Sequence, residues 1–333
     1  MTSSLHASAP ERLADAPATP LRVVPARYPL RIAGAFFSLF ILAGIVESVA
    51  LNERWEWPVF ASYFFHPVIL EGLGRTLLLT LLGTLFSIIA GTALALARLS
   101  SSALLSTLAW LYIWLFRSLP LILVLIILYN FSYLYDALAL GIPFTSFEFF
   151  RYPTIDVLGP FAVAVLGLTL VQSAYTAEII RGGILGVDAG QFEAAAALGL
   201  PGYRRTWRII LPQALRSILP TGFNEIISLA KGTSVVYVLA LPELFYTVQV
   251  IYNRTQQVIP LLMVAAIWYL VLTSVLSVLQ YFVERYVARG AVREIPPHPL
   301  WRIVERHIVQ RRLFQRYIFQ RYIFQRRIAR RPH

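Results

Sequence analysis

The sequence predicts an all-α integral membrane protein with six transmembrane helices. Three observations predict it. Of the 333 residues, 58 % are hydrophobic. The apolar residues gather in six runs of roughly 20, which is the length that crosses a bilayer as a helix. Arginines occur in every second connection between these runs, which is the pattern that the positive-inside rule predicts for the cytoplasmic side. An even number of spans therefore places both termini in the cytoplasm.

The first predicted span covers residues 32–51. Residues 1–28 before it are rich in Ala, Pro, Ser and Thr without apolar periodicity, so we expect them to be disordered. A cleaved signal peptide is the alternative, because residues 48–50 (SVA) resemble a cleavage site. We favour a retained helix, since the leader is long and the apolar run exceeds an ordinary signal sequence. Residues 29–66 then form an extra first helix and an outer loop.

Five further spans complete the predicted membrane domain, which we place at residues 72–282. They cover about 77–97, 110–133, 159–180, 217–239 and 259–283. We expect the connection between the third and fourth spans, residues 136–156, to be an outer loop. The arginines at 98, 204–216 and 285–293 then all fall on the inner side.

Residues 289–333 form a basic tail. It carries twelve Arg against two Glu, which is +10 of the net charge of +12. Residues 314–328 repeat FQRYI, FQRYI and FQRRI, and a five-residue period matches neither a helix nor a strand. Either the arginines attract the tail to anionic membrane lipid, or the repeat has no selected role.

Composition excludes several kinds of chemistry. The chain has no cysteine, so disulfides and thiolate sites are impossible. All five histidines lie outside the predicted spans, so we expect no metal site. A phosphate-binding G-x-x-x-x-G-K-[ST] loop and a serine-nucleophile elbow are both missing. We therefore expect no catalytic residue, no cofactor in this chain and no nucleic-acid partner.

The connection after the fourth span has strong local signals. Residues 191–198 are rich in Ala and favour a helix. Asp188 can cap that helix, and Gln191 can reach back in a capping box. Gly199 is suited to end the helix, and residues 201–202 (PG) favour a turn. A second helix follows with three arginines, Arg204, Arg205 and Arg208. This helix-turn-helix has a small, smooth face suited to a partner outside the membrane.

Seven positions in this connection have the spacing E-A-A-x3-G-x9-I-x-L-P. They are Glu193, Ala194, Ala195, Gly199, Ile209, Leu211 and Pro212. The spacing resembles the signature loop of ABC-importer permease subunits. The resemblance implies a type I permease fold whose cytoplasmic coupling helix docks on a partner ATPase, where ATP and Mg bind. It also implies a second permease subunit, identical or different, and an extracytoplasmic solute-binding protein.

The fifth span carries most of the candidate substrate pathway. Its polar residues lie within a stripe of roughly 80° on a helix. They are Thr221, Asn224, Ser228 and Lys231, the only lysine of the chain. A charge at membrane depth usually faces a cavity or a partner. The stripe therefore either lines the substrate pathway or forms a structural polar seam, such as a dimer interface.

Two more candidates lie on other spans. Gln172 is on the fourth span, and Arg117 on the third either snorkels to the inner surface or projects into a cavity. Glu178 and Arg181 are three residues apart and could form a structural ion pair.

Three flanking motifs narrow the resemblance, which covers about residues 68–285. Residues 174–183 (AYTAEIIRGG), 116–121 (FRSLPL) and 231–234 (KGTS) resemble motifs of the polar-amino-acid branch, with histidine-, glutamine- and arginine-type permeases. Gly232 stands where that branch usually has Asp. The resemblance implies ATP-driven import of polar amino acids across the bacterial inner membrane.

Two other classes of function are alternatives. A secondary carrier or channel would need an internal repeat or an ion-coupling carboxylate at depth, for which Glu225 is the only candidate. An intramembrane enzyme or an assembly scaffold is the other alternative. The shortage of catalytic side chains within the spans argues against it.

Overall fold

The computed structural model describes residues 29–142 and 147–287. The predicted disordered N-terminal segment and the basic tail with its repeats lie outside the described residues. The chain divides into two compact units, Met1–Trp55 and Glu56–His333.

The first unit contributes the helix α1 (Pro29–Leu51) and the 3-10 turn η1 (Glu53–Trp55). Residues 33–51 are long and apolar enough to cross a membrane. Nearly all of the described side chains of α1 are exposed. A helix that is apolar on all sides is suited to lipid surroundings. The helix predicted for residues 32–51 is therefore confirmed.

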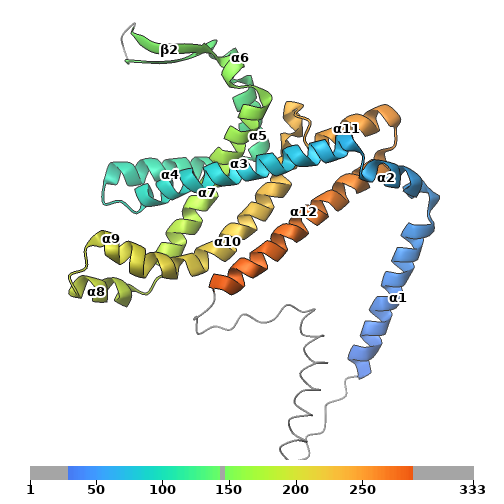
Figure 1. Ribbon diagram of the computed structural model, residues 1–333, viewed down its shortest axis with the longest axis horizontal. Coiled ribbons are helices and arrows are strands. Elements are labelled where there is room, and N and C mark those ends of the chain that lie inside the picture. The colour runs from blue at the N-terminus through green and yellow to red at the C-terminus, as the bar shows by residue number, and fades with distance from the viewer. Residues whose placement is uncertain (1–28, 143–146, 288–333) are drawn as a thin grey trace, which may run out of the picture. The chain divides into compact units, whose positions relative to one another are not determined.

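The second unit contains the remaining elements (Figure 1). In chain order they are α2 (Trp57–Phe64), α3 (Pro67–Arg98), α4 (Ala103–Ser118), α5 (Leu121–Tyr129), η2 (Asn130–Tyr133), β1 (Ala137–Gly141), β2 (Glu148–Pro153), α6 (Thr154–Val157), α7 (Pro160–Leu185), α8 (Ala189–Ala197), α9 (Gly202–Arg205), the π-helical turn η3 (Thr206–Ile210), α10 (Leu211–Gly232), η4 (Thr233–Leu239), α11 (Leu244–Thr255) and α12 (Val258–Val287).

Among the described helices, α1, α3, α7 and α12 can each cross a membrane alone. Two bent pairs raise the count to as many as six: α4 with α5, bent by 102°, and the segment from Gly202 to Leu239 with α11, bent by 49°. The prediction of six spans is compatible with this arrangement when each pair counts as one crossing.

The prediction of one continuous helix over 110–133 for the third span is wrong. The helix stops at Ser118, and a new helix starts at Leu121. Pro120 cannot donate a backbone hydrogen bond, and it drives the residue before it out of the helical region. Leu119 accordingly has ψ 133°. The first half also begins earlier than expected, at Ala103, where the Ser102 side chain accepts a hydrogen bond from Leu105 N.

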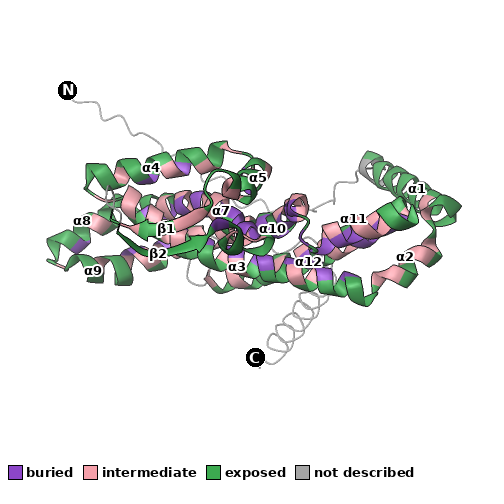
Figure 2. Ribbon diagram, turned by 90° about the horizontal axis from the view of Figure 1, so that it is seen from above, coloured by how far each residue is buried: buried purple, intermediate pink, exposed green. Residues whose placement is uncertain are grey.

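The packing of α3, α7 and α10 builds the centre of the second unit. A core cluster joins all three helices through Leu79, Leu168 and Leu229. The close approach of α3 to α7 depends on Gly91, because a Cβ there would lie 2.7 Å from the Cβ of Thr176. Buried positions concentrate where α7, α10, α11 and α12 meet their neighbours (Figure 2).

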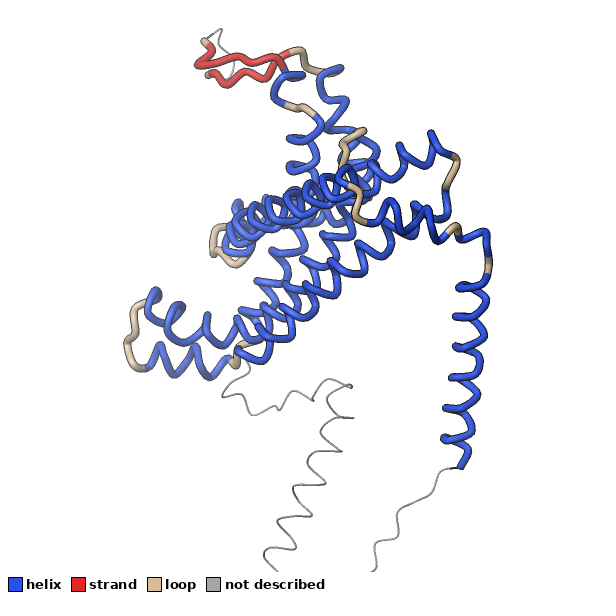
Figure 3. The backbone as a smooth tube through the Cα atoms, turned by 45° about the vertical axis from the view of Figure 1, so that its right-hand side comes forward, coloured by secondary structure: helices blue, strands red, loops and turns tan. Residues whose placement is uncertain are grey.

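The connection between α5 and α7, expected as a plain outer loop, contains an antiparallel two-stranded sheet. Leu138 pairs with Tyr152 and Leu140 with Phe150, so these four side chains share one face. Every residue of β2 is exposed. Figure 3 shows this hairpin near the start of α7 and the α8–α9 loop at its other end. The two features therefore mark opposite ends of the same helix.

Candidate functional site: the α8–α9 loop and an internal cavity

The predicted helix-turn-helix between α7 and α10 is confirmed. The Asp188 side chain accepts a hydrogen bond of 2.7 Å from Gly190 N and so caps α8. Gly199 has φ +64°, the left-handed conformation that glycine adopts most easily. The N–H groups of Gly199 and Leu200 close the end of α8 on the carbonyls of Ala196 and Ala195, a Schellman pattern.

The expected capping box at the start of α8 does not form. Gln191 does not reach back to Asp188; its side-chain oxygen instead accepts a hydrogen bond of 3.2 Å from Gln213 Nε2. The competing partner is on α10, so the amide links the first helix of the loop to the helix that follows the loop.

An apolar cluster holds the loop against the helix ends. Its buried members are Val187, Ile210 and Ala214, and Phe192 of α8 packs on it. Because Ile184 of α7 and Ile218 of α10 also pack on this cluster, a displacement of α8 is transmitted to both helices.

The signature residues lie on two sides of this loop. Glu193, Ala194, Gly199 and Pro212 are exposed, Ile209 and Leu211 are half-buried, and Ala195 is buried. The second half of the loop also exposes large side chains, including Trp207 and Tyr203. The π-helical turn η3 changes the phase of the helix just before α10. The loop therefore presents a small alanine face and an aromatic, basic face to its surroundings.

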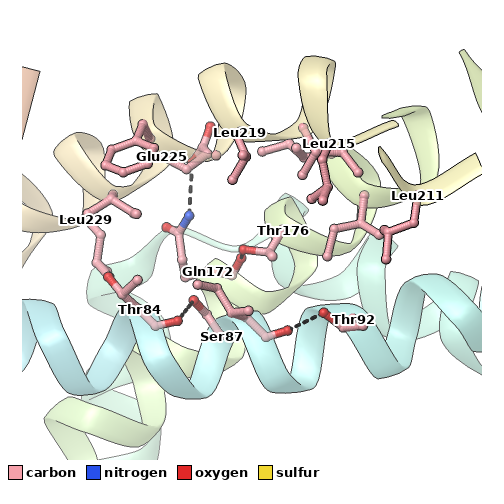
Figure 4. A pocket seen from close by; sticks show the side chains of 17 residues that line it. Thr84, Ser87, Thr92, Gln172, Thr176, Leu211, Leu215, Leu219, Glu225 and Leu229 are labelled. Atoms are coloured by element: carbon pink, nitrogen blue, oxygen red, sulfur yellow. Dashed lines mark hydrogen bonds between the residues drawn. The ribbon is translucent and has the colours of Figure 1, made fainter. Parts of the chain in front are cut away.

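A cavity of about 410 Å³ lies between α3, α7 and α10 (Figure 4). This volume is in the range typical of small-molecule sites. Most of its wall comes from α10, which contributes Leu, Ile and Phe side chains on the face that also carries Gly222 and Glu225. The cavity has a largely apolar wall with a few polar groups at fixed positions.

One hydrogen bond crosses this cavity wall between helices. Gln172 Nε2 on α7 donates to Glu225 Oε2 on α10, at 3.1 Å. Figure 4 shows the two side chains pointing toward each other above α3. Glu225 is the only ionisable side chain among the lining residues. The cavity therefore carries one carboxylate, and no cationic side chain lines it.

The hydroxyl groups of the wall add acceptors. Ser87 donates its proton to Thr84 O, Thr92 to Ile88 O and Thr176 to Gln172 O, all at 2.7–2.9 Å. Their oxygen lone pairs remain able to accept from a ligand. Thr84 Oγ1 is buried without a hydrogen-bond partner in the described part of the chain. Together with Glu225, these oxygens favour a ligand that is rich in donors.

The structure places the candidate pathway residues in different surroundings. Gln172 lines the cavity, whereas Thr221, Asn224, Ser228 and Lys231 are not among its lining residues. These four are exposed and share the opposite side of α10. Asn224 Oδ1 accepts a hydrogen bond of 3.1 Å from Gln280 on α12. The role of the stripe in the substrate pathway stays a prediction. Asn224 also takes part in the contact between α10 and α12.

Glu225 was missing from the predicted pathway residues. The available signal was its position as the only carboxylate deep in a predicted span. The spacing of three and four residues also puts Gly222, Glu225 and Leu229 on one face of α10, so the sequence could have predicted that they line the same surface.

Arg117 lies beside α7, and the predicted ion pair is on α7 itself. The Arg117 guanidinium lies over the ring of Tyr175, 5.4 Å from its centre. The pairing of Glu178 with Arg181 is confirmed, with Arg181 Nη2 donating to Glu178 Oε2 at 2.7 Å. Among the described residues, no three His, Cys, Asp or Glu side chains gather as a metal site.

Comparison with known proteins identifies relatives of this arrangement. Residues 83–289 match the family described as binding-protein-dependent transport system inner membrane component. The arginine transport system permease protein ArgU of Corynebacterium glutamicum is 36 % identical over 292 residues, covering 84 % of this chain and 87 % of that protein. The glutamate/aspartate import permease protein GltK of Escherichia coli O157:H7 is 34 % identical over 224 residues, covering 67 % and 94 %.

Solved structures show the same fold. A chain of an amino acid ABC transporter, crystallised with histidines, has a TM-score of 0.56 and 33 % identity, covering 66 % of this chain and 94 % of its own. An inward-facing form of the MetNI methionine ABC transporter has a TM-score of 0.54 and 17 % identity, with coverage of 66 % and 96 %.

Proposed function

The chain belongs to the binding-protein-dependent transport system inner membrane components, as a permease subunit of an ABC amino acid importer, and we propose that it imports amino acids with a cationic side chain. One observation carries the choice of substrate. Glu225 is the only ionisable side chain that lines the cavity. A carboxylate in apolar surroundings favours a cationic partner, since burying either charge alone is costly.

The apolar wall supports the same substrate class. Lysine and arginine have aliphatic stems that pack against apolar surfaces while the charged end stays with a polar partner. Leu215, Leu219 and Ile226 supply such a surface in the part of α10 that lines the cavity together with Glu225. An acidic amino acid would place a second carboxylate near Glu225, where like charges repel. ArgU, the relative named as an arginine transport permease, shares 36 % identity with this chain, in line with a cationic substrate.

The proposed mechanism is alternating access driven by a partner ATPase. ATP and Mg bind on that partner, which docks on the exposed residues of α8 around Glu193 and Gly199. Movement of α8 then reaches α7 and α10 through the cluster of Val187, Ile210 and Ala214. Because α7 and α10 form two of the three cavity walls, the motion changes access to Glu225.

The remaining assembly follows from the same proposal. The α8–α9 loop and both termini lie on the cytoplasmic side of the plasma membrane. A second permease subunit completes the transport pathway, and an extracytoplasmic binding protein delivers the amino acid. The exposed stripe of Thr221, Asn224, Ser228 and Lys231 faces that second subunit or the pathway between the two.

Uptake into vesicles tests the substrate class. The complex with its ATPase and binding protein is reconstituted, and ATP-driven uptake of labelled arginine, lysine, glutamine and glutamate is measured. We expect arginine and lysine to be preferred, and Glu225→Gln to lower their uptake by roughly 10- to 100-fold, the loss of one charge-assisted hydrogen bond. Glu148→Gln in the exposed hairpin is the matched control and should leave uptake unchanged. Preference for glutamate, or full arginine uptake by Glu225→Gln, would overturn the proposal.

A further inference from the structure

A carboxylate is buried at the end of α10 that lies away from the α8 loop. There the chain continues through η4, turns at Ala240, which has φ +52°, and enters α11. Glu243 precedes α11 and has no exposed surface. Within the described ranges it is the only side chain with a formal charge that is fully buried. The transport mechanism above gives this group no task.

Hydrogen bonds from three helices converge on Glu243. Its Oε1 accepts from Tyr246 N at 2.7 Å and so caps α11. Its Oε2 accepts from Tyr269 on α12 at 3.1 Å and from Thr76 Oγ1 on α3 at 3.3 Å. Thr76 Oγ1 in turn accepts from Leu244 N at 3.1 Å. One side chain therefore ties α11 to both α3 and α12.

The start of α11 packs closely against α3. A Cβ on Gly72 would lie 2.8 Å from Thr247 Oγ1 and 3.2 Å from Glu243 O. Arg75 of α3 donates to Pro242 O at 3.0 Å, just before α11. A change in the position of α11 would therefore break several contacts at once.

An apolar cluster surrounds the same junction. Ile69 of α3, Leu244 of α11 and Leu261 of α12 are buried against one another. In such surroundings an apolar side chain usually packs at least as well as an ionised one. The carboxylate is therefore better explained by the specific position that it gives α11 than by general stability.

We propose that Glu243 is a positioning residue for transport: it holds α3, α11 and α12 together as one block, so that α10 can move at its inner end while the outer end stays closed. This inference rests on the proposed function, because it takes the motion to start at α8. The link from α10 to α11 is short, so α11 follows α10 unless Glu243, together with the contacts around it, holds it to α3 and α12. Loss of the hold lets the outer end open together with the inner end.

Transport per ATP is the first test. Glu243→Gln keeps the size of the side chain and one acceptor oxygen, but it replaces the second acceptor with a donor. In the reconstituted complex we expect uptake per ATP hydrolysed to fall by about tenfold, the effect of weakening charged hydrogen bonds, with ATP hydrolysis and the apparent KM unchanged. Tyr269→Phe should lower the same ratio by a smaller factor. Thr76→Ser, which keeps the hydroxyl, is the control and should match the unaltered protein.

A distance measurement gives a second test that does not depend on substrate. The chain has no cysteine, so spin labels can be placed at Leu70→Cys on α3 and Asn253→Cys on α11, both exposed positions. In the complex, the distance should be the same with and without ATP. In Glu243→Gln it should change when ATP is added.

The outcomes separate the inference from the proposed function. An absence of ATP-driven uptake in the unaltered complex counts against the function alone. Two results would overturn the inference, because they would show that Glu243 supports folding only. One is that Glu243→Gln lowers uptake and ATP hydrolysis by the same factor. The other is that it broadens the distribution of spin-label distances equally with and without ATP.

Discussion

Gln172 on α7 donates a hydrogen bond of 3.1 Å to Glu225 on α10. These are the two helices that enter and leave the α8–α9 loop. The bond therefore joins the two cavity walls that a partner acting on the loop would move. The amide of Gln172 thus supplies a donor for the carboxylate.

Removal of this donor should make the protein more dependent on its substrate. Gln172→Leu leaves Glu225 without its partner, which costs roughly 1–3 kcal/mol. A bound guanidinium supplies new donors to the carboxylate, so arginine should raise the melting temperature more in Gln172→Leu than in the unaltered protein. Thermal unfolding in detergent with and without arginine measures both values. An equal or smaller shift in the variant would show that the ligand does not reach Glu225.

Gly199 should be sensitive to backbone strain and not to side-chain bulk. Its φ is +64°, and a Cβ there would meet nothing within 4 Å. Gly199→Val should therefore cost at least about 1 kcal/mol through the left-handed conformation and should uncouple ATP hydrolysis from uptake while membrane insertion is kept. Gly199→Asn should retain activity, because Asn tolerates this conformation.

Gly202 provides the matched control for Gly199. A Cβ at Gly202 also meets nothing within 4 Å, and its φ is not positive. Gly202→Ala should leave uptake per ATP unchanged. Normal ATP-driven uptake by Gly199→Val would contradict a docking role for the end of α8.

The loop was predictable because its signals are local. Asp188, Gly199 and residues 201–202 act on neighbouring backbone groups, so their effects can be derived without knowing the tertiary structure. The apolar runs likewise predicted the spans through their length. The one wrong capping detail, at Gln191, arose because Gln213 of another helix competes for the same side chain.

The cavity could not be derived from the sequence in the same way. Periodicity showed that Thr221, Asn224, Ser228 and Lys231 share a face of α10, and they do. In a membrane protein, however, an apolar face can meet lipid, a neighbouring helix or a cavity. The hydrophobic effect does not favour one of these surroundings over another, because lipid tails are as apolar as the protein interior. The direction of each face depends on helix tilt and on close contacts such as Gly91 with Thr176.

Gly91 should be essential for the crossing of α3 and α7. A Cβ there would lie 2.7 Å from Thr176 Cβ and 3.0 Å from Ser173 O, so Gly91→Ala must separate the helices or shift the backbone. Overpacking of this kind costs about 1–3 kcal/mol. The measured quantity is the unfolding temperature of the purified permease. Gly74→Ala on the same helix meets nothing within 4 Å and is the control; equal unfolding temperatures for the two variants would refute the close packing.

Lys231 should act in transport and not in assembly. It is exposed, it lies near the end of α10 away from the loop, and it forms no ion pair in the described residues. Lys231→Gln should therefore lower the rate of uptake while the ATPase still co-purifies with the permease. Uptake kinetics equal to those of the unaltered protein would show that the charge has no part in the pathway.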